Sequence, residues 1–421
     1  MSSLASPVFP PELSDYTIDF LYDDTTSLRA CALTCKTWLP ASRYHIFNAV
    51  KLNDAQDLDN LSSLVSSNSA PGIVPYIHTL SISKPSPTSG LSHPTSRSVT
   101  QWEAFVPSAL SLRLPLLDTL HIQSFLSFWQ PSSFSISSYG LFSSVRSLHL
   151  ANSSLRSFQE LRSLLGRLPK VDELWLDNVT FGIEQMFVGQ SLEMDDEGRM
   201  HSPFTSLTPL ASGTSTPRGL SGTSPVYDLV SLTSLRVDAN PKPMAILLGW
   251  LLLTPSIQTL RNVTFAALEA HDFDAVNTFL GVVGGSLERL SIGLKEGTDF
   301  VDLPLAFIRN LTLNALTFTS LSPTSSSSNA WIIPFFTRFA ADAVNPIPLQ
   351  SVTFEFSSDA AIKPASELAM PLDLPGLCKV LKATPYISRI AFHGIKSHQC
   401  GSAWKDVRRE LYGWSGQVLF K

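Results

Sequence analysis

The chain has 421 residues, of which 44% are hydrophobic and only 15% are charged, a balance that excludes an intrinsically disordered protein. Its net charge of −5 supplies no field that would attract nucleic acid or an anionic membrane surface. The length is too great for one compact core and indicates either several globular domains or one elongated repeat structure.

The cysteines and the N-terminal residues bear on the cellular compartment. No cysteine belongs to a C-x-x-C pair, and four cysteines in so long a chain do not make a disulfide framework. The first residues lack the basic and apolar stretches of a secretory signal, and the strongest apolar run, 244–253, is too short to cross a bilayer. We therefore expect reduced thiols, a cytoplasmic or nuclear location and no membrane partner.

Residues 1–52 predict a small helical module. Pro11 suits the first turn of a helix, and the polar run 23–27 ends that helix and offers N-caps for the next. Residues 28–35 place four small or apolar side chains at helical spacing, and a third short helix is expected at about 41–47. Three such helices bury little area alone, so their apolar faces require a partner, either the rest of this chain or another protein.

Residues 10–47 also carry an ordered set of short motifs: P-x-E-L, I-x-x-L, an Asp-rich break, S-L-x-x-C-A-L-x-C-x-x-W and R-x-x-x-F. Together they resemble the F-box in the form common in fungal proteins, over about one tenth of the chain. The resemblance implies binding to the Skp-type adaptor of cullin–RING ubiquitin ligases, with Leu13 and Leu28 as the main contacts and Trp38 in the core. The residues that it places in or behind the adaptor interface are Pro11, Glu12, Leu13, Ile18, Leu21, Leu28, Leu33 and Trp38.

After residue 70 the pattern apolar-x-x-Leu-x-apolar recurs along the chain. The copies at Val145 and Val171 start 26 residues apart, as do those at Leu287 and Leu313. A degenerate copy starts at Ile257, and its strand is expected to be two residues short. The nine regular copies start at Ile77, Leu117, Val145, Val171, Leu232, Leu287, Leu313, Leu349 and Ile387.

Period and pattern match the leucine-rich repeat, which has about 20–29 residues per unit. We therefore predict an α/β chain in which residues 53–421 form a right-handed solenoid of about ten repeats with a curved parallel sheet. A doubly wound α/β domain is the alternative, but its buried strands would be unbroken apolar runs. The expected return helices are 157–168, 244–253, 273–283, 331–344 and 377–382.

Three stretches rich in Ser or Pro interrupt the array, at 84–98, 189–225 and 322–329. Their composition cannot fill a core, so we expect loops, and we predict that 189–225 is a disordered insertion. This insertion accounts for the 61 residues between the copies at Val171 and Leu232. Its Ser-Pro and Thr-Pro pairs are either phosphorylation sites or parts of an unmodified loop.

No catalytic signature is recognised in the sequence: there is no nucleophile elbow, zinc-protease motif or phosphate-binding loop. Cys31, Cys35 and His45 could suggest a metal site, but structural zinc requires four ligands and no fourth is evident. We therefore expect a non-enzymatic chain without cofactor or metal, although a polar pocket with perturbed ionisable groups would favour a hydrolase instead.

The expected function is that of a substrate-recognition subunit of an SCF-type ligase, whose repeats bind an unidentified target protein. The alternative is a non-ligase scaffold in which the helical module merely caps the solenoid. Strand alternation places the target-binding side chains between the apolar positions, with Trp175 as the expected anchor. These residues are His121, His149, Glu173, Trp175, Asp177, Arg236, Asp238, Arg289, Glu355, Arg389 and His393.

Overall fold

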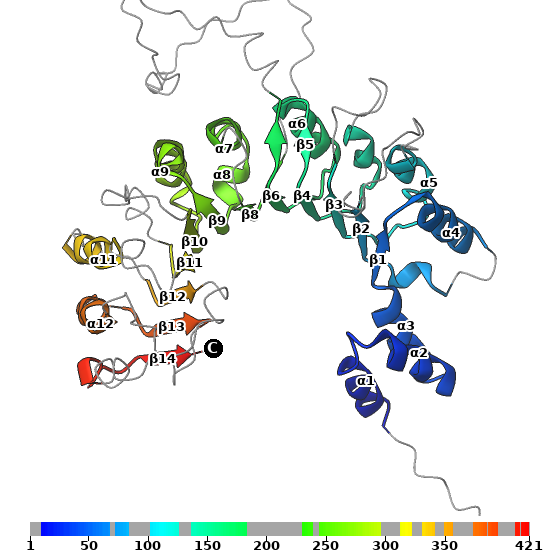
Figure 1. Cartoon of the computed structure of the whole chain (residues 1–421), viewed down its shortest axis with the longest axis horizontal. Coiled ribbons are helices and arrows are strands. Elements are labelled where there is room, and N and C mark those ends of the chain that lie inside the picture. The colour runs from blue at the N-terminus through cyan, green and yellow to red at the C-terminus, as the bar shows by residue number, and fades with distance from the viewer. Residues whose placement is uncertain are drawn as a thin grey trace, which may run out of the picture.

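The computed structural model is a mixed α/β structure built on one open parallel sheet of 12 strands. The strands follow the inner side of an arc and the larger helices follow its outer side (Figure 1). The predicted loops 84–98, 189–225 and 322–329 lie outside the described residues. The structure describes residues 10–67, 72–83, 102–125, 136–182, 230–238, 244–295, 312–321, 331–341, 349–356, 374–384, 386–394, 409–412 and 414–420.

Short strands alternate with helices along the chain. The strands of the large sheet are β1 (Ala49–Leu52), β2 (Thr79–Ser83), β3 (Thr119–Gln123), β4 (Ser147–Ala151), β6 (Glu173–Asp177), β8 (Ser234–Asp238), β9 (Asn262–Leu268), β10 (Arg289–Leu294), β11 (Ala315–Leu321), β12 (Ser351–Phe356), β13 (Arg389–His393) and β14 (Gln417–Phe420). A second, two-stranded sheet pairs β5 (Ser154–Leu155) with β7 (Thr180–Phe181). The α-helices are α1 (Pro11–Asp19), α2 (Thr25–Thr34), α3 (Leu39–Phe47), α4 (Ala55–Ser66), α5 (Val106–Leu110), α6 (Phe158–Arg167), α7 (Met244–Leu251), α8 (Ser256–Thr259), α9 (Phe273–Val283), α11 (Ile332–Ala341) and α12 (Leu374–Ala383). The 3₁₀ turns are η1 (Val74–Tyr76), η2 (Trp102–Phe105), η4 (Ile136–Leu141) and η6 (Ala270–Asp272).

The strand order of the large sheet follows the chain order from β1 to β14. Each new strand is added on the same side of the one before it, whereas in a doubly wound fold the strand order reverses at one point in the sheet. All nine regular copies of the leucine pattern supply strands, each starting two residues after the first apolar residue of the copy. The edge strands β1 and β14 were not predicted, and β1 lies within the segment that had been assigned to the helical module.

The pairing places equivalent apolar residues opposite one another, so they form continuous buried rows. Side chains at the intervening positions of each strand point to the other face, as strand geometry requires. The row at the second apolar position consists of Leu80, Leu120, Leu148, Leu174, Leu235, Val263, Leu290, Leu316, Val352 and Ile390, all at most 1% exposed.

One predicted register is wrong. The copy assigned to Ile257 starts instead at Leu260, which is fully buried, and continues through Val263 and Phe265. The strand is therefore complete, and Ile257 lies in the short helix α8 before it. The helix places Leu260 where the other copies have their first apolar residue.

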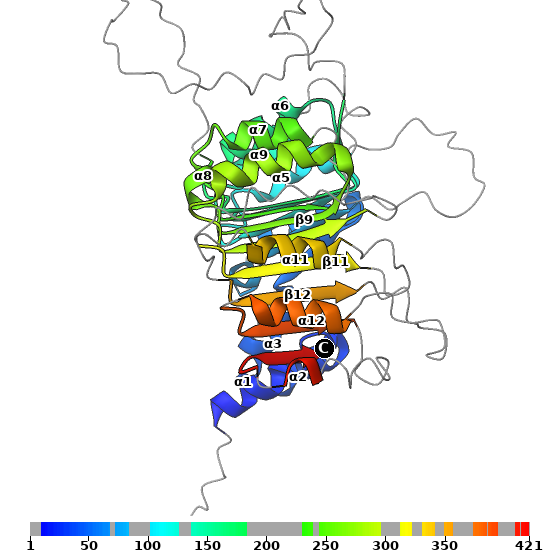
Figure 2. The same cartoon turned by 90° about the vertical axis from the view of Figure 1, so that its left-hand side faces the viewer.

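The return helices agree closely with the prediction and pack on the outer face of the sheet, as Figure 2 shows for α7, α9, α11 and α12. Helix α9 buries Val276, Phe279, Leu280 and Val283 at helical spacing. Of the helices in the described ranges, none combines the length and apolar character needed to span a membrane.

Phenylalanine replaces the smaller apolar residues at the third position of the later strands. Phe318, Phe354 and Phe392 are fully or almost fully buried and stack on one another, with ring centroids 5.7 and 5.4 Å apart. Phe336 of α11 meets Phe318 edge-on at 5.8 Å. These rings bind the sheet to its covering helix over several strands.

Three neighbouring strands of the large sheet, β3, β4 and β6, are each followed by a residue in the left-handed region: Ser124, Asn152 and Asn178, with φ of 60°, 48° and 48°. The backbone amide of each donates to the strand that follows in the sheet, as from Asn152 to the Asp177 carbonyl at 2.8 Å. The Asn178 side chain also donates to Asn152 Oδ1 at 2.9 Å. Asparagine tolerates this conformation better than most residues, which explains its recurrence here.

The helical module, α1 to α3, lies at the β1 end of the sheet (Figure 1). The Asp24 carboxylate accepts hydrogen bonds from the backbone amides of Thr26 and Ser27 at 3.0 Å and so caps α2, as the polar run predicted. Helix α3 packs against both other helices and against β1. It begins at Leu39, two residues earlier than the expected start at about residue 41, because Pro40 is accommodated in its first turn.

Candidate functional site

Four side chains on the inner face of the sheet stack on one another across four adjacent strands. The rings of His121 and His149 are 4.1 Å apart, and those of His149 and Trp175 are 3.9 Å apart. The Arg236 guanidinium lies 5.2 Å from the centroid of Trp175, on the next strand. We call these four residues the stacked ladder.

The ladder results directly from the strand register. Each of its members occupies the same position of the repeated pattern, between the second and third apolar residues. The pairing sets His121 opposite His149, His149 opposite Trp175 and Trp175 opposite Arg236. Neighbouring strands are about 4.8 Å apart, a spacing at which planar side chains in one row contact face to face.

Stacking and burial keep the histidines neutral. Burial, together with the nearby His121 and Arg236, lowers the pKa of His149 to about 4, and burial is the largest of these causes. Burial also lowers the pKa of His121. Both rings are therefore uncharged at neutral pH and behave as flat, weakly polar surfaces.

Two carboxylates lie beside the ladder at the ends of β6 and β8. Arg236 Nε donates to Asp238 Oδ2 at 2.8 Å, which fixes the guanidinium over Trp175. Asp238 Oδ1 is buried and has no hydrogen-bond partner among the described residues. Burial raises the pKa of Asp177, and the opposing Asp238 raises it further, while Arg236 lowers it.

The ladder borders an open hollow with a volume of about 460 Å³. The hollow extends over six neighbouring strands, from Lys51 on β1 to Asp238 on β8. Its lining includes the small side chains of Ser81 and Ser83 on β2 and of Ala151 on β4. The lining combines the rings of the ladder with carboxylates at one end and a lysine at the other.

A serine–histidine pair is present in the ladder, because Ser147 Oγ lies 3.2 Å from His149 Nε2. Within the described residues no carboxylate bonds the other nitrogen of this ring. A pKa of about 4 also makes His149 a weak proton acceptor at neutral pH. The pair therefore lacks the orientation and basicity on which a hydrolase triad depends.

Six of the predicted target-binding residues line this hollow: His121, His149, Trp175, Asp177, Arg236 and Asp238. Trp175 is only 37% exposed, and His149 and Arg236 cover its two faces, so it offers an edge instead of the free face expected of an anchor. The sequence did not single out the other lining residues, although aligning the copies by their leucines would have placed them. They include Lys51, Ser81, Ser83, Gln123 and Ala151.

The remaining predicted target-binding residues do not line the hollow. Glu173 is half-buried on β6, and Arg289 is exposed on β10. Glu355 and His393 face each other on β12 and β13, with Oε1 and Nδ1 3.5 Å apart, and Arg389 is exposed on β13. The sheet order separates these later strands from the hollow.

The predicted adaptor-binding residues divide into a core and a surface. Ile18 and Leu28 are fully buried, which corrects the expectation that Leu28 is a direct contact. Leu13 and Leu33 are 49% and 88% exposed, Glu12 is exposed, and Leu21 and Trp38 are half-buried. Pro11 lies in the first turn of α1, and its side chain is outside the described part of the structure.

More large apolar side chains are exposed on the same module. Tyr16, Phe20 and Tyr22 are each more than 60% exposed, and the rings of Tyr16 and Phe20 meet edge-on at 4.7 Å. Behind this surface, His45 Nε2 lies 2.8 Å from Asp19 Oδ1 and ties α3 to the end of α1. The module thus buries a few of its own side chains and leaves several large apolar ones exposed.

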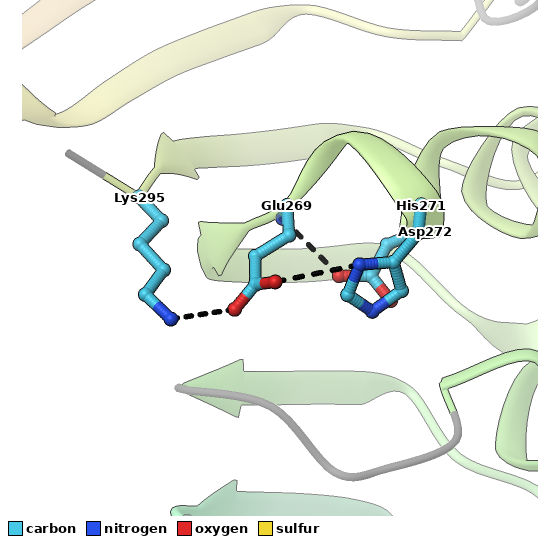
Figure 3. Close-up of polar contacts among 4 residues, drawn as sticks. All are labelled: Glu269, His271, Asp272 and Lys295. Carbon is cyan, nitrogen blue, oxygen red and sulfur yellow. Dashed lines mark hydrogen bonds and ion pairs between the residues drawn. The ribbon is translucent and has the colours of Figure 1, made fainter. Parts of the chain in front are cut away.

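A second polar cluster follows β9 and serves the fold (Figure 3). Asp272 accepts from the backbone amide of Glu269 at 3.1 Å in a reciprocal capping box, and Lys295 Nζ lies 2.6 Å from Glu269 Oε1. His271 Nδ1 lies 3.4 Å from Glu269 Oε2. The carboxylates are thus used in fixing the turn into α9, and the described ranges contain no group of His, Cys, Asp or Glu that could hold a metal ion.

The sequence matches no family model. A search of curated proteins finds no significant relative of the chain. Its function must therefore be inferred from its own residues.

Proposed function

We propose that this chain is a non-catalytic, substrate-recruiting subunit of an SCF-type ubiquitin ligase. In this proposal α1 to α3 form an F-box that docks the Skp-type adaptor, and the inner face of the sheet binds a target protein. The adaptor complex would hold the target near a charged conjugating enzyme and raise its effective concentration there.

The observation that carries the proposal is the exposed apolar surface of the helical module. Leu13, Tyr16, Phe20, Tyr22 and Leu33 are 49% to 88% exposed, although the module is too small to stabilise itself well. Exposed apolar clusters on small modules mark docking surfaces. A helical cap that served only the sheet would turn these side chains toward it.

We further propose that the sheet and its outer helices form a right-handed leucine-rich-repeat solenoid. The corrected copy at Leu260 supports this, because it starts 28 residues after Leu232 and 27 residues before Leu287. The copies from Leu232 to Leu313 thus start 26 to 28 residues apart, and a unit of this length with one strand and one return segment is typical of this repeat.

The test is binding of purified full-length chain to a recombinant Skp-type adaptor. Leu33→Asp and Leu13→Asp should each weaken binding about 30-fold or more, as expected for a charge placed at an interface anchor. Leu112→Asp is the matched control, because Leu112 is 95% exposed but lies next to α5, away from the module. Adaptor binding that is absent in the unmodified chain, or unchanged by both module variants, would refute the proposal.

A further inference from the structure

The stacked ladder stops at His121, although the row of strand positions continues. The next residue in register is Ser81 on β2, and the one after it is Lys51 on β1. Ser81 carries no ring, and no described ring covers His121 from the β2 side. We call the space above Ser81, between His121 and Lys51, the Ser81 site.

The size of the Ser81 site follows from strand spacing. Lys51 and His121 stand two strands apart, so the gap between their rows is roughly 9–10 Å. This is twice the separation of the stacked rings, and one planar group fits between them. The hollow includes all three of these residues, so the site is open to its interior.

We infer that the Ser81 site binds an aromatic side chain of the target segment, stacked on His121, with an acidic neighbour of that side chain paired to Lys51. This inference rests on the proposed role of the inner face in target binding, and it names the chemistry recognised there. The neutral imidazole of His121 accepts an aromatic ring without a charge penalty.

Charge complementarity identifies the acidic neighbour. Among the lining residues, Lys51 is exposed and carries the charge at the β1 end, whereas Asp177, Asp238 and Arg236 lie at the other end, where Arg236 is paired with Asp238. A target segment that places its carboxylate at Lys51 and its aromatic ring above Ser81 complements this distribution of charge along the hollow. The opposite order would bring its carboxylate toward the two aspartates.

The experiment uses the full-length chain with labelled histidines and three capped dipeptides: Glu-Tyr, Lys-Tyr and Glu-Leu. Glu-Tyr should shift the ring resonances of His121 and bind about three- to tenfold more tightly than Glu-Leu, the gain expected from one stacked aromatic pair. It should also bind more tightly than Lys-Tyr, and Lys51→Glu should reverse that preference.

Two matched variants locate the site. Ser81→Phe fills the gap with a ring from the chain itself and should abolish the Glu-Tyr effect. Thr264→Phe adds the same ring at the same register position beyond Arg236 and should leave it unchanged. The circular dichroism of both variants checks that the fold is retained.

Equal binding of Glu-Tyr and Glu-Leu, or an unchanged Glu-Tyr effect in Ser81→Phe, would overturn the inference. Free tyrosine binding as tightly as the dipeptide would indicate a small-molecule site instead of a protein segment, and would overturn it too. Adaptor binding is measured separately with the module variants. Adaptor binding without dipeptide binding rejects the Ser81 site alone, and the reverse result rejects the ligase proposal alone.

Discussion

Protonation of His149 should destabilise the folded chain in mildly acidic solution. Its pKa is about 4 in the folded state, against an ordinary value of 6.5. Below pH 6.5 the unfolded chain therefore binds more protons at this residue than the folded chain does. The free energy of unfolding should be unaffected above pH 6.5, fall as the pH decreases toward 4, and level off below that.

The size of the effect follows from the two pKa values. At pH 5 the difference between the folded and unfolded pKa values of His149 corresponds to a loss of about 2 kcal/mol in the free energy of unfolding, if solvent screening is ignored. The ring borders the open hollow, so water screens part of this, and about 1 kcal/mol is expected.

His149→Phe is the matched variant, because phenylalanine can stack between His121 and Trp175 but cannot be protonated. Urea unfolding of both proteins should be measured between pH 5 and 8. The variant also loses the contact with Ser147, so the comparison concerns the pH dependence and not the absolute stability. The unmodified chain should lose about 1 kcal/mol more than the variant between pH 7.5 and 5.

Titration of the histidine ring signals by NMR provides an independent reading. A His149 pKa near 6.5, or identical pH profiles for the two proteins, would refute the proposed burial and stacking of this ring. The free energy of unfolding of both proteins should also depend on pH through His121, because burial lowers the pKa of that ring as well.

Three further predictions concern the fold and are measured by urea unfolding. Phe354→Ala should cost about 3–5 kcal/mol, because the ring is fully buried between two stacked phenylalanines; a loss below 1 kcal/mol would contradict this packing. Leu260→Ala should cost about 2–5 kcal/mol and Ile257→Ala clearly less, and the reverse ranking would restore the register predicted from the sequence. Ser124→Asn should stabilise the chain by about 0.5 kcal/mol, since asparagine tolerates φ of 60° better than serine, and a destabilised variant would argue against this backbone conformation.

The spacing of the leucine pattern was sufficient to locate most of the sheet. Two or three apolar residues per copy alternate with polar ones, and this period identifies a strand whatever surrounds it. The copy at Leu260 was misplaced because Ile257 offers an apolar residue at the same spacing, and only the short helix α8 distinguishes them. Strand β1 was missed because Phe47, Val50 and Leu52 carry the pattern within a segment that had been assigned to helices.

The candidate site was predicted only in part, for a physical reason. Alternation tells which side chains face inward on one strand, but it does not tell which residues of different strands are opposite one another. The stacking of His121, His149 and Trp175 requires the register of three strands at once. The burial of Leu28 likewise depends on how α2 packs against α3, which the helical period alone does not determine.

Trp175 and Arg236 contact each other although their copies of the pattern start 61 residues apart, whereas the copies of His149 and Trp175 start 26 apart. Closing the longer connection costs less than about 1 kcal/mol of additional chain entropy, because that cost grows only with the logarithm of length. Distance along the chain is thus nearly independent of distance across the sheet. The contact between Trp175 and Arg236 is therefore fixed by the pairing of β6 with β8 and not by the number of residues that connect these strands.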